Sequence, residues 1–333
     1  MDFNLDPKIV VIGGGTGSFT ILSGLKNYYK YITAIVNMAD DGGSTGQLRD
    51  ELGVLPPGDV RQCLVALSNS PKMRDLFNYR FESGSLDGHA FGNLFLTALE
   101  KMTGSFAEAI DVADEVLNVQ GRVVPVTLDS VKLVMKTKSG AEDIVGEYQI
   151  GNMNFNLSQK RPKLELTPKA ILNPQARKAI EIADLIIIAP GNLYGSLAPA
   201  LLVDGMGKLL SSAKAKKVFV CNLVTKPGQT DGFMVDDFAS ELERFVGEQF
   251  IDYVLFNNEE PSKKLEARYI KDAEYMVGYS LLAKKKHYKV RGSNLLAKEL
   301  PKTNSADKIQ HTRSYIRHDP DLVARELMNI YGE

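Results

Sequence analysis

Lys8-Ile9-Val10-Val11-Ile12-Gly13-Gly14-Gly15-Thr16-Gly17-Ser18 is the stretch that decides the fold of this chain. Residues 8–12 form a mostly β-branched run, which is typical of a strand buried on both faces in a parallel sheet. The run ends in glycines, and apolar residues at helical spacing predict a helix from Thr16 to Lys26. A strand, a glycine turn and a helix in this order indicate the first unit of a doubly wound α/β fold.

The same alternation of strands and helices returns along the chain. Further strands are expected at 32–36, 185–189, 217–221 and 252–256. One helix is expected to begin at Ser44 or Thr45, and a second to run from an N-cap at Asp59 to Ser70-Pro71. A capping box of Ser105 and Glu108 predicts the start of a third. A long helix is expected to contain Leu202, Met206, Leu209 and Leu210, and a last one to span residues 321–330. The pattern predicts a Rossmann-like three-layer αβα sandwich with a mostly parallel sheet, and residues 1–333 as a single domain.

Residues 122–150 interrupt this alternation. Apolar residues at 131, 133 and 135 alternate with other side chains, Ser139-Gly140 suits a turn, and residues 144–150 suit a returning strand. We expect a β-hairpin excursion here, at a sheet edge or standing off the sheet. Residues 151–173 show little periodicity and are expected to be extended loop.

The length, charge and hydrophobic content of the chain limit the classes of protein to which it can belong. The chain has 333 residues, 44% of them hydrophobic, a formal net charge of −1 and two cysteines, Cys63 and Cys221. The charge favours neither nucleic acid nor an anionic surface, and no apolar run approaches the roughly 20 residues that span a bilayer. We expect a cytoplasmic protein with buried thiols that binds a small molecule. A homodimer is left open, and no protein partner is indicated.

Four loops should meet where the carboxyl ends of parallel strands form one edge, which is where such sheets bind ligands. The first, Gly13 to Ser18, opens a helix whose backbone N–H groups suit a phosphate. It is neither a full G-x-G-x-x-G nor a P-loop. The alternative is a tight turn with no ligand.

The second loop, Asp40-Asp41-Gly42-Gly43-Ser44-Thr45-Gly46, places two carboxylates at another glycine-rich helix start. Asp40 and Asp41 are candidates to hold Mg²⁺, to contact ribose or sugar hydroxyls, or to act in catalysis. The alternative is that they only cap turns and helices. An NAD-binding protein would have an acid at the end of the second strand, where this chain has Asn37.

Other polar residues near these loops are candidate ligand contacts. A guanidinium could grip a phosphate through two hydrogen bonds, and a histidine could act as acid or base or recognise a hydroxyl. For the arginines the alternative is a solvated surface, and for His89 a bond to a loop carbonyl. The candidates are Asn37, Gly42, Gly43, Ser44 and Thr45 at the second loop, Arg49, Arg61, His89 and Asn93, Pro190, Gly191, Asn192 and Ser196 of the third loop, and Asn222 and Lys226 of the fourth.

Taken together, these segments resemble the CofD-like family, and within it the gluconeogenesis-factor (YvcK-like) branch. The resemblance rests on the run from Asn37 to Leu67, on Gly88-His89-Ala90-Phe91-Gly92-Asn93-Leu94 and on Pro190-Gly191-Asn192-Leu193-Tyr194-Gly195-Ser196, in this order. It implies a Rossmann-like fold, a nucleotide-type ligand of the UDP-N-acetylglucosamine kind, and a role in cell shape and in growth on gluconeogenic carbon.

The resemblance also implies alternatives. CofD proper is a 2-phospho-L-lactate transferase with a Ser-Pro-Asp-x-Asp-Thr-like segment, where this chain has Leu55-Pro56-Pro57-Gly58-Asp59-Val60-Arg61 and one carboxylate fewer. Lys226-Pro227-Gly228-Gln229-Thr230 stands where the branch usually has Gln-Pro-Gly-Glu-Thr, so Lys226 is an added candidate phosphate partner. A nucleotide-sugar-binding regulatory protein is the leading hypothesis, ahead of a Mg²⁺-dependent transferase and of a binder of NAD-type dinucleotides.

Overall fold

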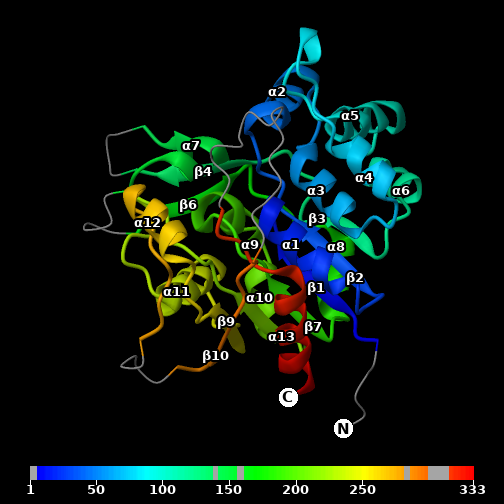
Figure 1. Cartoon of the computed structure of the whole chain (residues 1–333). Helices are drawn as coiled ribbons and strands as arrows, with labels where there is room; N and C mark the ends of the chain where they lie inside the picture. The colour runs from blue at the N-terminus through cyan, green and yellow to red at the C-terminus, as the bar shows by residue number, and fades with distance from the viewer. Residues whose placement is uncertain (1–5, 138–141, 156–160, 281–285, 299–314) are drawn as a thin grey trace.

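The structure, a computed structural model, describes residues 6–137, 142–155, 161–280, 286–298 and 315–333 (Figure 1). Its centre is a seven-stranded sheet in the order β10-β9-β8-β7-β1-β2-β3, with every neighbouring pair parallel. The strands are β1 (Ile9–Gly13), β2 (Ile32–Val36), β3 (Arg122–Pro125), β7 (Leu185–Ile188), β8 (Lys216–Val220), β9 (Tyr253–Asn257) and β10 (Lys289–Ser293). The predicted doubly wound, mostly parallel α/β fold is confirmed.

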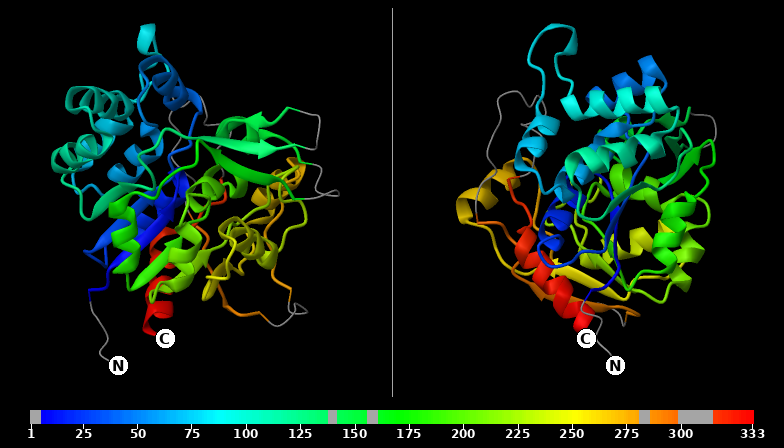
Figure 2. Two further views of the ribbon diagram at one scale, coloured as in Figure 1. Left: turned by 180° about the vertical axis from the view of Figure 1, so that it is seen from behind. Right: turned by 90° about the vertical axis from the view of Figure 1, so that its right-hand side faces the viewer.

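Helices cover both faces of this sheet. One layer packs around α1, which contacts α3 and α13, and α8, α10 and α11 pack together in the other layer (Figure 2). The helices are α1 (Gly15–Leu25), α2 (Gly43–Leu52), α3 (Pro57–Leu67), α4 (Pro71–Asn78), α5 (Phe91–Thr103), α6 (Phe106–Leu117), α7 (Glu147–Asn152), α8 (Pro174–Glu181), α9 (Ala198–Leu201), α10 (Met206–Ser212), α11 (Val235–Val246), α12 (Lys263–Lys271) and α13 (Pro320–Gly332), with a 3₁₀ turn η1 (Gly84–Leu86) and a π-helical turn η2 (Leu193–Leu197). No helix of the described residues is long and apolar enough to cross a bilayer.

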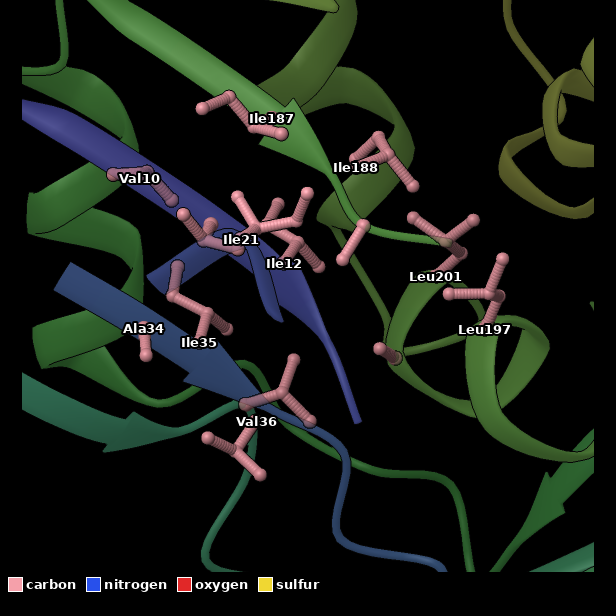
Figure 3. Packing of buried hydrophobic residues seen from close by; sticks show 14 of the residues in the cluster. Val10, Ile12, Ile21, Ala34, Ile35, Val36, Ile187, Ile188, Leu197 and Leu201 are labelled. Carbon is pink, nitrogen blue, oxygen red and sulfur yellow. The ribbon is translucent and has the colours of Figure 1, made fainter. Parts of the chain in front are cut away.

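Burial on both faces of the sheet explains why the strand sequences are continuously hydrophobic rather than alternating between hydrophobic and polar residues. Side chains of β1, β2 and β7 point to both faces, and all residues of β1 and β7 are buried (Figure 3). Ile21 on α1 packs over one face of the sheet (Figure 3). Leu197 and Leu201, from the segment after β7, belong to the same buried core. Burying an aliphatic side chain of this size stabilises the fold by about 1.5–3 kcal/mol. Both cysteines are buried and free, as expected.

The order in which successive strands are added to the sheet reverses at β1. This strand pairs with β2 on one side and with β7 on the other. The loops that leave β1 and β7 therefore start side by side. A Cβ on Gly17 would lie 1.7 Å from the carbonyl oxygen of Pro190, so the two loops touch through their backbones. Glycine is required at position 17 for this approach.

The predicted excursion is present, but it is larger than a hairpin. β4 (Lys132–Lys136) pairs antiparallel with β5 (Ile144–Val145), as expected, and also with β6 (Lys163–Thr167), giving a separate three-stranded sheet. Two expectations were wrong: β6 lies within the stretch predicted as loop, and the predicted returning strand ends at Val145, where α7 follows. Residues 122–125 belong to the main sheet, and the predicted turn at Ser139-Gly140 lies outside the described residues.

Other local predictions had mixed outcomes. The Ser105 hydroxyl caps α6 by accepting a hydrogen bond from the N–H of Glu108 (3.3 Å). Asp59 is not an N-cap, because α3 begins at Pro57 and Asp59 lies in its first turn. The long helix predicted after β7 is broken into η2, α9 and α10, with Gly205 at φ +85° before α10. That left-handed geometry ends a helical run, and periodicity alone does not reveal it.

Replacing Gly17 by alanine tests the contact between the two loops. We expect Gly17→Ala to lower the free energy of unfolding by about 2 kcal/mol or more, because the new methyl group must displace the backbone at Pro190. Thr16→Ala, at an exposed position of the same turn, should stay within about 0.5 kcal/mol of wild type. Chemical denaturation measures both, and equal effects of the two variants would contradict the contact.

Candidate functional site

The glycine turn after β1 faces a carboxylate. The N–H of Gly15 donates to Asp59, and Cβ atoms on Gly14 and Gly15 would lie 2.4 and 3.0 Å from its oxygens. Ser18 is buried, with its hydroxyl on the side of Gly13, while Thr16 is exposed. The carboxylate of Asp59 therefore already accepts a hydrogen bond from one of the backbone N–H groups that the sequence suggested for binding a phosphate.

Asp40 and Asp41 point to different places. One oxygen of Asp40 accepts from the N–H of Gly42 (3.0 Å), and the Thr45 hydroxyl also donates to this carboxylate. The other oxygen lies 3.0 Å from where a Cβ on Gly58 would stand, beside Asp59. Asp41 instead accepts from the N–H groups of Glu147 (3.2 Å) and Tyr148 (2.8 Å), at the start of α7. Asp40 is thus the aspartate of this pair that lies beside Asp59.

Glu147 brings a further carboxylate to the same place, and we call Asp40, Asp59 and Glu147 the carboxylate cluster. Burial, then the charge of Asp40, raises the pKa of Asp59 to about 7. Burial, then the charges of Asp40, Asp59 and Asp41, raises the pKa of Glu147 to about 8. Burial also raises the pKa of Asp40. Each group would be stabilised in its charged form by a nearby cation.

A cavity of about 390 Å³ opens beside this cluster. Asp40 and Glu147 lie on its lining, and so do the guanidinium-bearing residues Arg61 and Arg80. The remaining lining residues are Gly42, Gly43, Ser44, Thr45, Gln47, Gly58, Gln62, Asp87, Gly88, Asn93 and Tyr148. The pocket combines acidic and basic residues, so a cation and an anionic group can bind in it side by side.

A hydrogen-bond network orders the basic part of the cavity. Arg61 donates to the side-chain oxygens of Asn93 (2.9 Å) and Asn78 (2.6 Å). Asn93 donates to the Ser44 hydroxyl (3.3 Å), which also pairs with Nδ1 of His89 (2.9 Å). The structure thus joins four predicted residues, Ser44, Arg61, His89 and Asn93, in one network. Held in this way, Arg61 presents a fixed guanidinium to the cavity.

Two predicted contacts lie beside the carboxylates and the glycine turn but not on the lining of the cavity. Arg49 is buried and donates to the carbonyl of Val131 (2.6 Å), so it ties α2 to the start of the excursion. Asn37 is buried and accepts from the N–H of Ala39 (3.0 Å), which shapes the turn after β2. Neither residue lines the cavity.

The third and fourth loops turn toward α7 and toward each other. Asn192 caps η2 by accepting from the N–H groups of Tyr194 and Gly195, and it donates to the carbonyl of Gly151 (3.0 Å). Lys226 donates to the same carbonyl. Asn222 pairs with the main chain of Gly191, to which it donates at 2.7 Å. Ser196 is half-buried in η2.

The cluster suits a cation that also binds phosphate. Among the described residues, no three His, Cys, Asp or Glu side chains are arranged as a complete set of metal ligands. Mg²⁺ is commonly held by one or two carboxylates together with phosphate oxygens and water. Asp40 and Asp59, whose pKa values are raised chiefly by burial, would hold such an ion, and it would link them to an anionic ligand.

Sequence reasoning missed Asp59, Glu147 and Arg80 as site residues. The sequence indicates Asp59 only as a helix cap, although it follows Pro56-Pro57-Gly58 and stands two residues before a candidate arginine. Glu147 and Arg80 stand in segments with no recognisable motif. Only the fold brings them to the carboxyl edge of the sheet.

Known proteins resemble this chain over nearly its whole length. Residues 9–296 match the sequence profile of the family described as 2-phospho-L-lactate transferase CofD. The chain belongs to the CofD family. Curated relatives include a "Putative gluconeogenesis factor" of Thermoanaerobacterium thermosulfurigenes, 42% identical over 97% of each chain, and the "Gluconeogenesis factor" of Bacillus subtilis, 37% identical over 98% of this chain and 99% of that protein.

A solved structure of the family agrees with the fold. The crystal structure of a Bacillus halodurans protein, described in a second structure as a member of the UPF0052 family, superposes with a TM-score of 0.85 at 35% identity. The alignment covers 97% of this chain and 99% of that chain. The resemblance to the CofD family and its gluconeogenesis-factor branch is therefore confirmed.

The pH dependence of stability tests the environment of Glu147. Because its pKa of about 8 in the folded protein exceeds the ordinary 4.5, the wild type should lose more stability than Glu147→Gln as pH rises through that interval. In metal-free buffer, we expect the variant to exceed wild type in free energy of unfolding by about 1 kcal/mol or more at pH near 8, and to match it near pH 5. Chemical denaturation at both pH values measures this, and a pH-independent difference would contradict it.

Proposed function

We propose that the protein is a regulatory protein that binds a nucleotide sugar of the UDP-N-acetylglucosamine type together with a divalent cation. The observation that carries the proposal is the cavity whose lining has carboxylates and guanidinium groups close together. The family membership supports a nucleotide-type ligand, and the name of the relatives supports a role in growth on gluconeogenic carbon. A role in cell shape rests on the family resemblance.

The cation is needed for an electrostatic reason. A diphosphate that enters this cavity meets Asp40 and Glu147, with Asp59 at the glycine turn. Like charges in a poorly solvated pocket repel strongly. A divalent ion on Asp40 and Asp59 neutralises their two negative charges, so that the phosphates can be held between the ion and Arg61.

Several other predicted residues have a place in this proposal. The glycine turn Gly13 to Ser18 lets Asp59 approach the backbone closely, and Ser44, Asn93 and His89 offer hydrogen bonds to sugar or ribose hydroxyls. Asp41, Asn192 and Lys226 act indirectly, since the structure shows them bound to α7.

Calorimetric titration with UDP-N-acetylglucosamine, with and without Mg²⁺, tests the proposal. We expect Mg²⁺ to strengthen binding at least about tenfold, and Asp59→Asn to remove that dependence. Asp231→Asn, at an exposed aspartate, is the matched control and should bind like wild type. Absence of binding by the folded wild-type protein, or tighter binding of NAD than of the UDP-sugar in competition, would overturn the assignment.

A Mg²⁺-dependent transferase is the second candidate function. The description of the family favours it, and so does Asp59, which places a second carboxylate beside Asp40 where the acidic segment of the sequence looked incomplete. Asp40 and an arginine on the lining of the cavity, with Asp59 beside Asp40, could stabilise the charge of a transferred phosphoryl-type group.

This second candidate predicts Mg²⁺-dependent turnover of a nucleotide diphosphate substrate. Asp40→Asn should lower the turnover by about a hundredfold or more, because that carboxylate would help to hold the ion at the reacting group. Phosphate or nucleotide release, followed by chromatography, measures it. An undiminished rate in Asp40→Asn would exclude the paired carboxylates from any such reaction.

A further inference from the structure

Tyr148 is an exposed aromatic residue on the lining of the candidate cavity. Its relative exposure is 61%, and its ring is the one aromatic group among the described residues that line the cavity. The other described lining residues are glycines or carry polar or charged side chains. Within the described part of the chain, no hydrogen bond or ring contact involves the Tyr148 side chain. The ring is therefore open to a ligand in the cavity.

Contacts with the second loop fix where this ring stands. The N–H of Tyr148 donates to the carboxylate of Asp41 (2.8 Å) at the start of α7. A Cβ on Gly42 would lie 3.3 Å from Cδ2 of the Tyr148 ring, so a glycine at position 42 lets the ring lie against the backbone. The same loop carries Asp40, and the ring is thus held next to the carboxylate side of the cavity.

The other end of α7 is tied to the third and fourth loops. The side-chain amide of Gln229 donates to three main-chain carbonyls there, those of Ile150 (3.0 Å), Gly151 (2.9 Å) and Met153 (2.9 Å). Asn192 and Lys226 also donate to the carbonyl of Gly151. Polar residues that the sequence assigned to ligand binding therefore hold the short helix that carries Tyr148.

A nucleotide ligand needs three kinds of partner, and the polar residues of the cavity supply two of them. Charged groups suit the diphosphate, and the network of Ser44, His89 and Asn93 suits hydroxyls. The base is planar, and its faces gain most from stacking on an aromatic ring. Single exposed tyrosines are common on protein surfaces, but this one stands on the cavity lining and is held there from both ends of its helix.

We propose that Tyr148 is the platform on which the base of the nucleotide sugar stacks, with Asp41 and Gln229 as positioning residues that hold it at the cavity. The inference rests on the proposed function for the identity of the ligand. It assigns the base to α7, the diphosphate to the charged residues, and the hydroxyls to the network around Ser44. It also gives Asp41 a role that differs from that of Asp40.

Calorimetric titration of the full-length protein in Mg²⁺ buffer tests the platform with UDP-N-acetylglucosamine, UDP and pyrophosphate. Tyr148→Ala should raise the Kd of both uridine ligands by the same factor, about tenfold, because the stacking surface is lost. Its Kd for pyrophosphate, which has no base, should stay within about twofold of wild type. Tyr148→Phe keeps the ring and should bind all three ligands within about twofold of wild type.

Tyr31→Ala is the matched control. It removes a tyrosine of similar exposure (58%) just before β2, at the opposite edge of the main sheet. It should bind all three ligands like wild type.

A fluorescence measurement reports stacking directly, because the chain has no tryptophan. Tyr148→Trp keeps an aromatic face at the cavity, and UDP should quench the fluorescence of the new indole while pyrophosphate leaves it unchanged. Tyr31→Trp should respond to neither ligand.

A double-mutant cycle tests the positioning role of Gln229. Gln229→Met removes three hydrogen bonds to α7, so it should weaken UDP binding in the wild-type background. It should add little in the Tyr148→Ala background, because the platform is already absent. Circular dichroism checks that each variant is folded, and equal effects of Gln229→Met in the two backgrounds would contradict the positioning role.

The outcomes distinguish this inference from the proposed function. If wild type binds UDP-N-acetylglucosamine and Tyr148→Ala binds it equally well, the platform is refuted and the proposed function stands. A loss for the UDP-sugar but not for UDP would place the ring on the sugar, and an equal loss for pyrophosphate would point to damage at the charged residues; either result refutes stacking on the base. If wild type binds neither uridine ligand, the proposed function and the platform fall together.

Discussion

The pairing of β1 with β2 on one side and β7 on the other is the constraint on which the rest of the structure depends. It makes the strand order reverse at β1, so the loops that follow β1 and β7 leave the same edge and separate only after they touch at Gly17 and Pro190. Ligand sites of doubly wound sheets lie at such a reversal because it opens a crevice. Here the excursion after β3 reaches back into that crevice.

The carboxyl edge of the main sheet carries more negatively charged groups than a turn that binds only a phosphate. The N–H of Gly15 already binds Asp59, and Asp40 and Glu147 lie close by with raised pKa values. Groups of this kind attract a cation before they accept an anion. The arginines on the cavity lining then favour an anionic partner. In the proposed function, binding of a nucleotide diphosphate and binding of a metal ion are therefore one electrostatic problem rather than two separate properties.

Elements of the fold could be predicted from the sequence where the contacts that form them join residues close together in the chain. The β1–α1 unit, the other central strands and the Ser105 cap rest on local patterns, and they were recognised from residues close together in the chain. β6, the break after η2 and the helical start at Glu147 were missed. The strand β6 forms because β4 offers it a partner, and α7 is held by Asp41, 106 residues before Glu147. Short segments with weak periodicity take the structure that their neighbours impose.

The sequence by itself determined the parallel sheet, the glycine turn and the edge at which polar residues would collect, because strand periodicity and strand direction follow from the local order of residues. It also carried the family membership. Only the tertiary structure decided which polar residues meet: it joined Asp59 and Glu147 to Asp40, and it turned Asp41, Asn192 and Lys226 to α7. The reason is physical, since a carboxylate or an amide has no preferred partner until the fold brings a donor within reach and removes water from both.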